Sequence, residues 1–157
     1  MGLVIIGDTR EKIAWQFPNM VRKKLEFGDY TIRGMESCVR VERKGSLREL
    51  AANMVGRARA RYASIYRSMA GMRWKALVVE SDLTELGHPM LQGERGEAVL
   101  RYLTRINTEY GVPVHFLRSP ALACRWTRAW FEMIWSLRTT GHTGLRAVGR
   151  QMVGAPS

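Results

Sequence analysis

One short segment, from Cys38 to Lys44, constrains the fold of this chain more than any other feature of its sequence. Its β-branched residues predict a strand, and successive side chains of a strand point to opposite faces of the sheet. Glu42 and Lys44 are therefore expected to share one face, with Arg43 on the other. We interpret this acid and lysine as the feature around which the rest of the chain is organised.

A second strand-like segment, roughly residues 25–33, carries Asp29 in its middle. Because only a short turn separates the two segments, we expect a hairpin in which Asp29, Glu42 and Lys44 converge. Two carboxylates beside an ammonium group can hydrolyse phosphodiesters, since the carboxylates hold Mg²⁺ and the lysine orients or activates the attacking water. The alternative is that Glu42 and Lys44 form a surface pair, which contributes little to stability.

The balance of charge limits the classes of partner. The chain of 157 residues fits one compact domain and carries 25 Lys and Arg against 14 Asp and Glu, a net charge of +11. Such an excess favours nucleic acid, because each phosphate neutralised by a cation releases counterions. An anionic membrane would require a basic amphipathic helix with a bulky apolar face or a lipidation signal. The termini show neither, so we expect no membrane partner.

The two cysteines, Cys38 and Cys124, lie far apart and lack the spacing of metal ligands. Reduced thiols are their expected state in a cytoplasm. The apolar run at residues 3–6 is too short for a signal peptide or a membrane span. We therefore expect a cytoplasmic protein.

Hydrophobic patterns predict strands that alternate with helices. A buried strand at residues 3–6 ends at the polar run Asp8-Thr9-Arg10-Glu11, and further strands are expected near residues 20–25, 75–80 and 112–117. Polar residues at the end of a buried strand are often functional, so Asp8 is a candidate site residue.

Ser46 and Glu49 match a capping box, which predicts the start of one long helix that runs to about Ala70. Its apolar stripe includes Val55 and Tyr62. Two more helices are expected, at about 94–110 and 120–137. The order of elements predicts an α/β fold with a mixed β-sheet flanked by helices.

The predicted long helix is strongly basic over its second half. Six cations and no acid lie from Gly56 through Lys75. Arg57 and Arg61 are four residues apart on one face, a spacing able to straddle a phosphate backbone. We expect Arg57, Arg61 and Arg10 to contact DNA phosphates.

The last predicted helix carries the aromatic stripe of Trp126 and Trp130, extended by Leu122, Met133 and Ile134. Such a stripe packs in a core or forms a homodimer face. Residues 139–157 are rich in glycine and contain no acid, so we expect a flexible basic tail after a domain at 1–138.

Three motifs in one order, Asp8-Thr9-Arg10-Glu11, Gly28-Asp29 and Glu42-Arg43-Lys44, resemble the signature of the XPF/Hef-type structure-specific endonucleases. That family is a branch of the PD-(D/E)xK nuclease superfamily. The resemblance extends through the basic helix to the strand at 77–80, and beyond it only the order of elements agrees. It implies a restriction-endonuclease-like core and hydrolysis of branched or structured DNA in repair or recombination.

The resemblance also implies roles for the residues of the motifs. Asp29 and Glu42 would bind Mg²⁺ or Mn²⁺, with Asp8 as a further metal-binding acid. Lys44 would position or deprotonate the water and offset charge in the transition state. Arg43 belongs to the signature, and its opposite orientation suggests that it pairs with an acid such as Glu11 or braces the site.

The chain departs from the family pattern after Lys44. The last acid of the signature is expected four positions later, but Arg48 is at that position. If Gly45 is an insertion, Glu49 is the equivalent acid. The alternative is that Glu49 only caps the helix. Glu80, at the end of its strand, is a further possible acid.

Many family members also carry a tandem helix-hairpin-helix domain or a helicase, and this sequence shows neither. That difference favours a stand-alone nuclease of a bacterium or phage. The alternatives are a catalytically inactive DNA-binding module of the same fold and a structure-selective ribonuclease.

Overall fold

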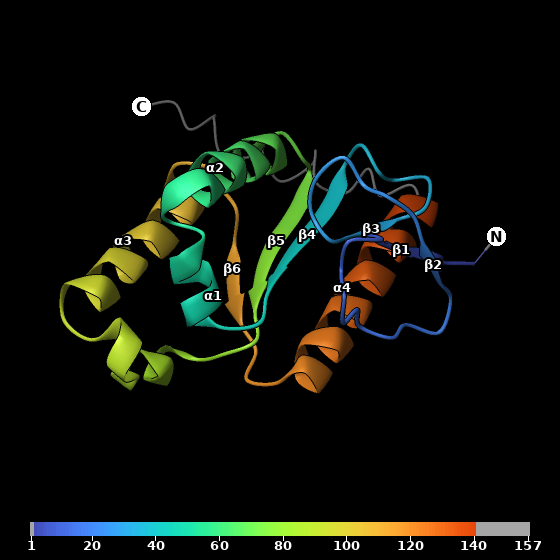
Figure 1. Cartoon of the computed structure of the whole chain (residues 1–157). Coiled ribbons are helices and arrows are strands. Elements are labelled where there is room, and N and C mark those ends of the chain that lie inside the picture. The colour runs from blue at the N-terminus through green and yellow to red at the C-terminus, as the bar shows by residue number, and fades with distance from the viewer. Residues whose placement is uncertain (1, 141–157) are drawn as a thin grey trace, which may run out of the picture.

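The computed structural model describes residues 2–140 and shows a six-stranded mixed sheet with helices on both faces (Figure 1). This confirms the predicted α/β fold. The spatial order of the strands is β2 (Met20–Arg22), β1 (Ile5–Gly7), β3 (Tyr30–Ile32), β4 (Val39–Lys44), β5 (Trp74–Val79) and β6 (Val114–Phe116).

The strand directions explain why the sheet is mixed. β1 is parallel to β2 and antiparallel to β3, and β4, β5 and β6 are parallel to one another. β3 and β4 form the predicted antiparallel hairpin, with Tyr30 opposite Val41. β3 is shorter than expected, so Asp29 directly precedes the strand instead of lying in its middle.

Two hydrophobic clusters cover the two faces of the sheet. α4 (Pro120–Thr139) packs on one face, where Val41 and Val78 point. α1 (Leu47–Ala52), α2 (Gly56–Ala70) and α3 (Glu94–Thr108) cover the other face, where Leu77 and Val79 point. Because side chains alternate along a strand, Arg43 shares the α4 face with Val41, and Glu42 lies on the opposite face.

The single long helix predicted after Ser46 is wrong, because the structure contains two helices. Asn53 ends α1, and α2 begins at Gly56, whose φ of +59° favours glycine. The break changes which side chains face the core: Val55, expected in the apolar stripe, is 65% exposed, whereas Tyr66 is fully buried.

The segment between β5 and α3 contains two short 3₁₀ turns, η1 (Leu83–Gly87) and η2 (Pro89–Leu91). Glu85 reaches from η1 to the start of α1, where its carboxylate accepts hydrogen bonds from the backbone N–H groups of Leu47 (2.8 Å) and Arg48 (3.2 Å). This loop therefore caps the helix that follows β4.

The buried face of α4 differs from the predicted stripe. Leu122 is 40% and Met133 is 60% exposed, and the buried positions are Ala123, Thr127, Phe131 and Ile134, of which only Ile134 belongs to the predicted stripe. Trp126 and Trp130 are half-buried and pack against the core cluster. The homodimer through residues 120–137 stays a prediction, which light scattering at micromolar concentration would test.

Helix α4 ends at Thr139, one residue beyond the predicted domain boundary. The predicted tail, 139–157, otherwise lies outside the described residues. Within residues 2–140, no helix combines the length and apolarity that crossing a membrane requires. Cys38 and Cys124 are both free thiols, as expected.

Candidate active site

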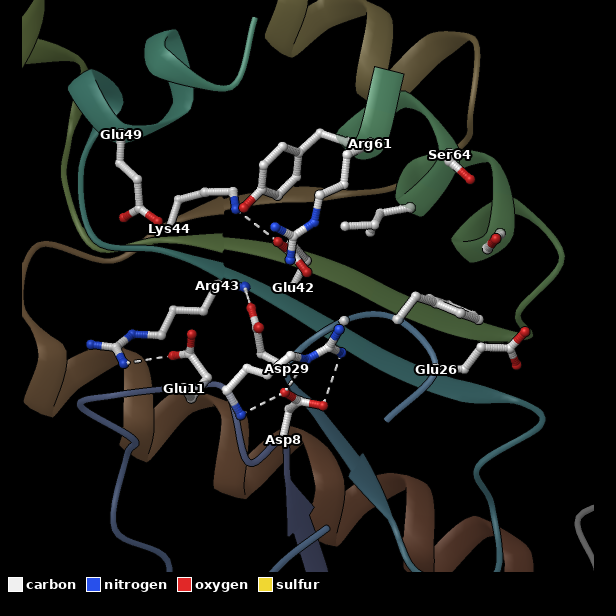
Figure 2. Close-up of a pocket in the computed structure, with 16 residues that line it drawn as sticks. Asp8, Glu11, Glu26, Asp29, Glu42, Arg43, Lys44, Glu49, Arg61 and Ser64 are labelled. Atoms are coloured by element: carbon white, nitrogen blue, oxygen red, sulfur yellow. Dashed lines mark hydrogen bonds and ion pairs between the residues drawn. The ribbon is translucent and has the colours of Figure 1, made fainter. Parts of the chain in front are cut away.

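A groove of about 480 Å³ lies beside β4 on the face covered by α2. Its walls are α2 and the turn before β3, and Figure 2 shows Glu49 and Glu26 at its two ends with Glu42 between them. The sequence-predicted residues that line this groove are Asp8, Arg10, Asp29, Glu42, Arg43, Lys44, Glu49 and Arg61.

Glu42 and Lys44 form a buried ion pair within the groove. The distance from Lys44 Nζ to Glu42 Oε1 is 2.7 Å. The side chain of Lys44 is 2% exposed and that of Glu42 is 4% exposed. A surface pair is therefore excluded. The ring centroid of Tyr62 lies 3.9 Å from Nζ, in cation–π contact. Burial alone would lower the pKa of Lys44, but the charge of Glu42 and its hydrogen bond raise it above the ordinary value.

Asp29 is held by the backbone of β4. Its N–H donates to the carbonyl of Val41 (2.9 Å), and its Oδ2 accepts from the backbone N–H of Arg43 (2.7 Å). Desolvation raises the pKa of Asp29 well above its ordinary value, and repulsion from Glu42 adds to the shift. Both carboxylates line the groove, where their charges repel each other.

Gly28 makes this placement of Asp29 possible. Its φ is +72°, and a Cβ built on it would lie 2.7 Å from Cδ of Arg40. Arg40 itself is buried and donates to the carbonyl of Phe27 (3.0 Å) and to that of Glu36 (2.7 Å). A side chain at position 28 would therefore displace either Arg40 or the turn that carries Asp29.

The donor set fits a divalent cation that also uses water or substrate oxygens. Asp29 Oδ1 and Glu42 Oε2 accept no hydrogen bond from any residue that the structure describes. Within residues 2–140, no three acidic, His or Cys side chains form a ready-made metal site. Mg²⁺ is commonly bound by one or two carboxylates together with water and phosphate, so Asp29 and Glu42 suit it.

Asp8, the third predicted metal ligand, is instead engaged by Arg10. Both carboxylate oxygens accept from the guanidinium, at 2.7 Å and 3.0 Å, and Oδ2 also accepts from the N–H of Leu25 (2.6 Å). Burial alone would raise the pKa of Asp8, but these hydrogen bonds outweigh it and hold the pKa below its ordinary value. Arg10 also donates to the carbonyl of Leu25 (2.8 Å), so it fixes the wall of the groove.

Arg43 points away from Glu42 and braces the other side of β4. Its guanidinium makes a bidentate contact with Glu80 (2.6 Å and 3.1 Å), reaches Glu11 (3.2 Å) and lies over the ring of Trp15. The predicted pairing with Glu11 is confirmed. Glu80, predicted as a possible additional acid, lies on the α4 side of the sheet beside Trp15 and is not among the residues that line the groove.

Glu49 lies in the first turn of α1 and contacts Gly45. Its own N–H donates to Ser46 Oγ (3.0 Å), which is one of the two hydrogen bonds of the predicted capping box. Its Oε2 accepts from the N–H of Gly45 (2.6 Å), one residue before the N-cap residue Ser46. Its side chain is exposed and lines the end of the groove. Glu49 therefore caps the helix, and a role in metal binding stays a prediction.

The predicted phosphate contacts on α2 lie in different places. Arg61 lines the groove, whereas Arg57 is exposed but is not among the lining residues.

Sequence reasoning missed Tyr62 and Arg40 as site residues. Tyr62 fits the predicted apolar stripe and so carries no signal of its own, and no local pattern connects Arg40 with Gly28.

Comparisons with known proteins describe the fold. No family model and no curated protein matches the chain. Among solved structures, it is similar to XPF from Aeropyrum pernix, with a TM-score of 0.58 and 18% identity over 98% of this chain. XPF from Aeropyrum pernix in complex with DNA gives a TM-score of 0.59 and 18% identity over 89% of this chain. The chain spans 66% of each of those chains, slightly less than two thirds. This likeness and the six-stranded mixed sheet together show that the chain has an XPF-like fold.

Proposed function

We propose that this chain is a metal-dependent endonuclease that hydrolyses phosphodiester bonds of branched or structured DNA. The observation that carries the proposal is one groove in which Asp29 and Glu42 each present a free oxygen beside the ammonium group of Lys44. The similarity in fold to an XPF in complex with DNA supports the choice of DNA. The net charge of +11 supports it independently.

Asp29 and Glu42 would hold Mg²⁺ or Mn²⁺, which supplies Lewis-acid polarisation of the phosphate and a nucleophile from water. Lys44 offers a fixed ammonium group that orients water and offsets charge on the pentacovalent transition state. The Tyr62 ring and Glu42 keep that ammonium group in one position. The backbone N–H of Arg43 orients Asp29, and the side chain of Arg43 keeps β4 in register with its surroundings.

Asp8 and Arg10 act as a unit in this proposal. The side chain of Arg10 is 47% exposed and lines the groove, so it suits a phosphate contact while it holds Asp8. A direct contact of Asp8 with the metal requires Arg10 to move away from it. Arg61 adds a second phosphate contact from α2, and Arg57 a third at the exposed start of that helix.

Two substitutions test the proposal. Asp29→Ala and Glu42→Ala should remove metal-dependent cleavage, while far-ultraviolet circular dichroism stays that of the wild type. Glu132→Ala, which removes an exposed acid paired with Arg128 on α4, outside the groove, is the control and should cleave normally. Unchanged nicking by both groove variants would contradict the mechanism.

The substrate is tested with flap, fork, Holliday-junction and linear molecules, as DNA and as RNA, in Mg²⁺, Mn²⁺ or EDTA. Cleavage of branched DNA that EDTA abolishes is the expected result. Binding without cleavage would identify an inactive DNA-binding module, and cleavage of the RNA substrates alone would identify a ribonuclease. A rise in melting temperature with Mn²⁺ that is lost in Glu42→Ala would locate the metal independently of cleavage.

A further inference from the structure

The groove extends well beyond the two carboxylates. Its far part is lined by Glu26, Phe27, Ser64, Ile65 and Ser68. The three residues from α2 lie at helical spacing from Arg61, so they share one face of the helix. From Arg61 to Ser68 this face extends about 10 Å along the helix axis, and Figure 2 shows Glu26 at this end, away from Lys44.

The polar side chains in this far part are exposed and make no direct contact with other polar side chains of residues 2–140. Within the described residues, the side chains of Glu26, Ser64 and Ser68 form no hydrogen bond or ion pair with another residue, although the charge of Glu26 acts on the nearby Arg40. The contrast with Asp8, all of whose oxygens accept hydrogen bonds from the protein, is strong. Side chains without protein partners are available to a ligand.

The chemistry of these side chains suits a nucleobase better than a phosphate. The carboxylate of Glu26 repels phosphate, and the half-buried Phe27 and Ile65 offer apolar surface to a flat ring. Phe27 is held in place by Arg40, whose guanidinium lies 4.5 Å from the ring centroid. Arg61 lines the groove between Lys44 and Glu26 (Figure 2), so it suits a contact with a neighbouring phosphate of the same strand.

We propose that the far part of the groove binds one unpaired nucleotide next to the scissile phosphate and prefers a base with an exocyclic amino group. A carboxylate accepts a hydrogen bond from the N4 amino group of cytosine or the N6 amino group of adenine, whereas thymine presents a carbonyl oxygen there. Ser64 and Ser68 donate to ring nitrogens or carbonyl oxygens of either kind. The proposal rests on the proposed nuclease function, because it names a feature of that enzyme's substrate.

The test uses fork DNA whose single-stranded arms are all cytosine or all thymine. Cleavage rates in Mg²⁺ and affinities in EDTA, from fluorescence anisotropy, are measured for each fork. The wild type should favour the cytosine arm about fivefold, the ratio expected of one partly solvated hydrogen bond. Glu26→Ala should reduce this ratio below about twofold, and Glu26→Lys should reverse it, because lysine donates to the thymine O4.

Glu36 provides the matched control. Burial lowers the pKa of Arg40, and Glu26 and Glu36 both oppose that shift, so each acid lies near the same arginine. Only Glu26 of the two lines the groove within the described residues. Glu36→Ala and Glu36→Lys should therefore keep the wild-type ratio between the cytosine and thymine forks. The comparison uses this ratio because general effects of charge on DNA affinity act on both forks and cancel.

Each outcome separates the subsite from the nuclease. Equal use of both arms by the wild type, or a ratio that survives Glu26→Ala, overturns the subsite. Binding in EDTA with the cytosine preference, lost in Glu26→Ala but without cleavage of any fork, overturns the nuclease function and supports the subsite. The absence of both binding and cleavage for every fork overturns both.

Discussion

Gly28 shows at the scale of a single residue how the backbone positions a carboxylate. Its left-handed conformation turns the chain so that Asp29 enters the hairpin, and its missing side chain leaves room for Arg40. The aliphatic part of Arg40 fills that space while its guanidinium binds the carbonyl of Phe27. The placement of Asp29 therefore depends on two features of residue 28, its φ angle and its size.

Gly28→Ala should destabilise the protein by about 3 kcal/mol, because an L-residue at positive φ and a close contact with Arg40 both contribute. Gly111→Ala separates the two effects, since Gly111 has a φ of +62° but a Cβ added to it would meet no atom within 4 Å. We expect that control to lose about 1 kcal/mol. Urea denaturation measures both, and equal losses would show that the contact with Arg40 is unimportant.

Helix α1 illustrates at the scale of an element how distant segments fix the site. The helix follows Lys44 by two residues, and its first turn is held by Ser46 and by Glu85 from the loop after β5. Glu85 also contacts the side chains of Ser81 and Arg48. The loop at residues 81–93 thus determines where the chain leaves β4.

The lowered pKa of Glu85 predicts how the contribution of this residue to stability depends on pH. Burial would raise this pKa, but hydrogen bonds from Ser81, Leu47 and Arg48 outweigh burial and lower it. A carboxyl group whose pKa is lowered by folding stabilises the folded state above its unfolded pKa of about 4.3, and that contribution is lost as pH falls through the folded pKa. Glu85→Gln should therefore cost about 1–2 kcal/mol at pH 7 and progressively less below about pH 4.

Chemical denaturation of Glu85→Gln at pH 7, 5 and 3 measures this dependence. Glu132→Gln is the control, because Glu132 makes an exposed ion pair with Arg128 within α4. It should change stability by less than about 0.5 kcal/mol at every pH. A cost for Glu85→Gln that is constant with pH would contradict the proposed role of its charge.

At the scale of the whole molecule, the net charge of +11 is expected to make DNA affinity strongly dependent on salt. If Arg61 contacts a phosphate, Arg61→Ala should reduce the slope of log affinity against log salt by about one. Arg101→Ala, an exposed cation on α3 that does not line the groove, should leave the slope unchanged. Anisotropy titrations over a range of salt concentrations measure both slopes.

The sequence predicted the sheet and its hairpin well, because alternation along β4 and the short turn before it are local patterns. The break between α1 and α2 was missed, since the apolar spacing continues through Val55 although Gly56 already favours a break. Local patterns also could not show the ion pair between Arg10 and Asp8 or the cation–π contact between Lys44 and Tyr62. Both contacts depend on how the folded chain places the side chains. The roles of these residues in catalysis stay predictions.

The break before α2 has a consequence for local opening of the groove. Val55 makes no side-chain capping hydrogen bond within the described residues, and the first turn carries Arg57 and Arg59, whose charges oppose the helix dipole. The other end of α2 is fixed by Tyr66 and Met69, which are fully buried. We therefore expect amide hydrogens in the first half of α2 to exchange faster than those near Met69. Such opening would widen the groove near Arg61 and leave its width near Ser68 unchanged.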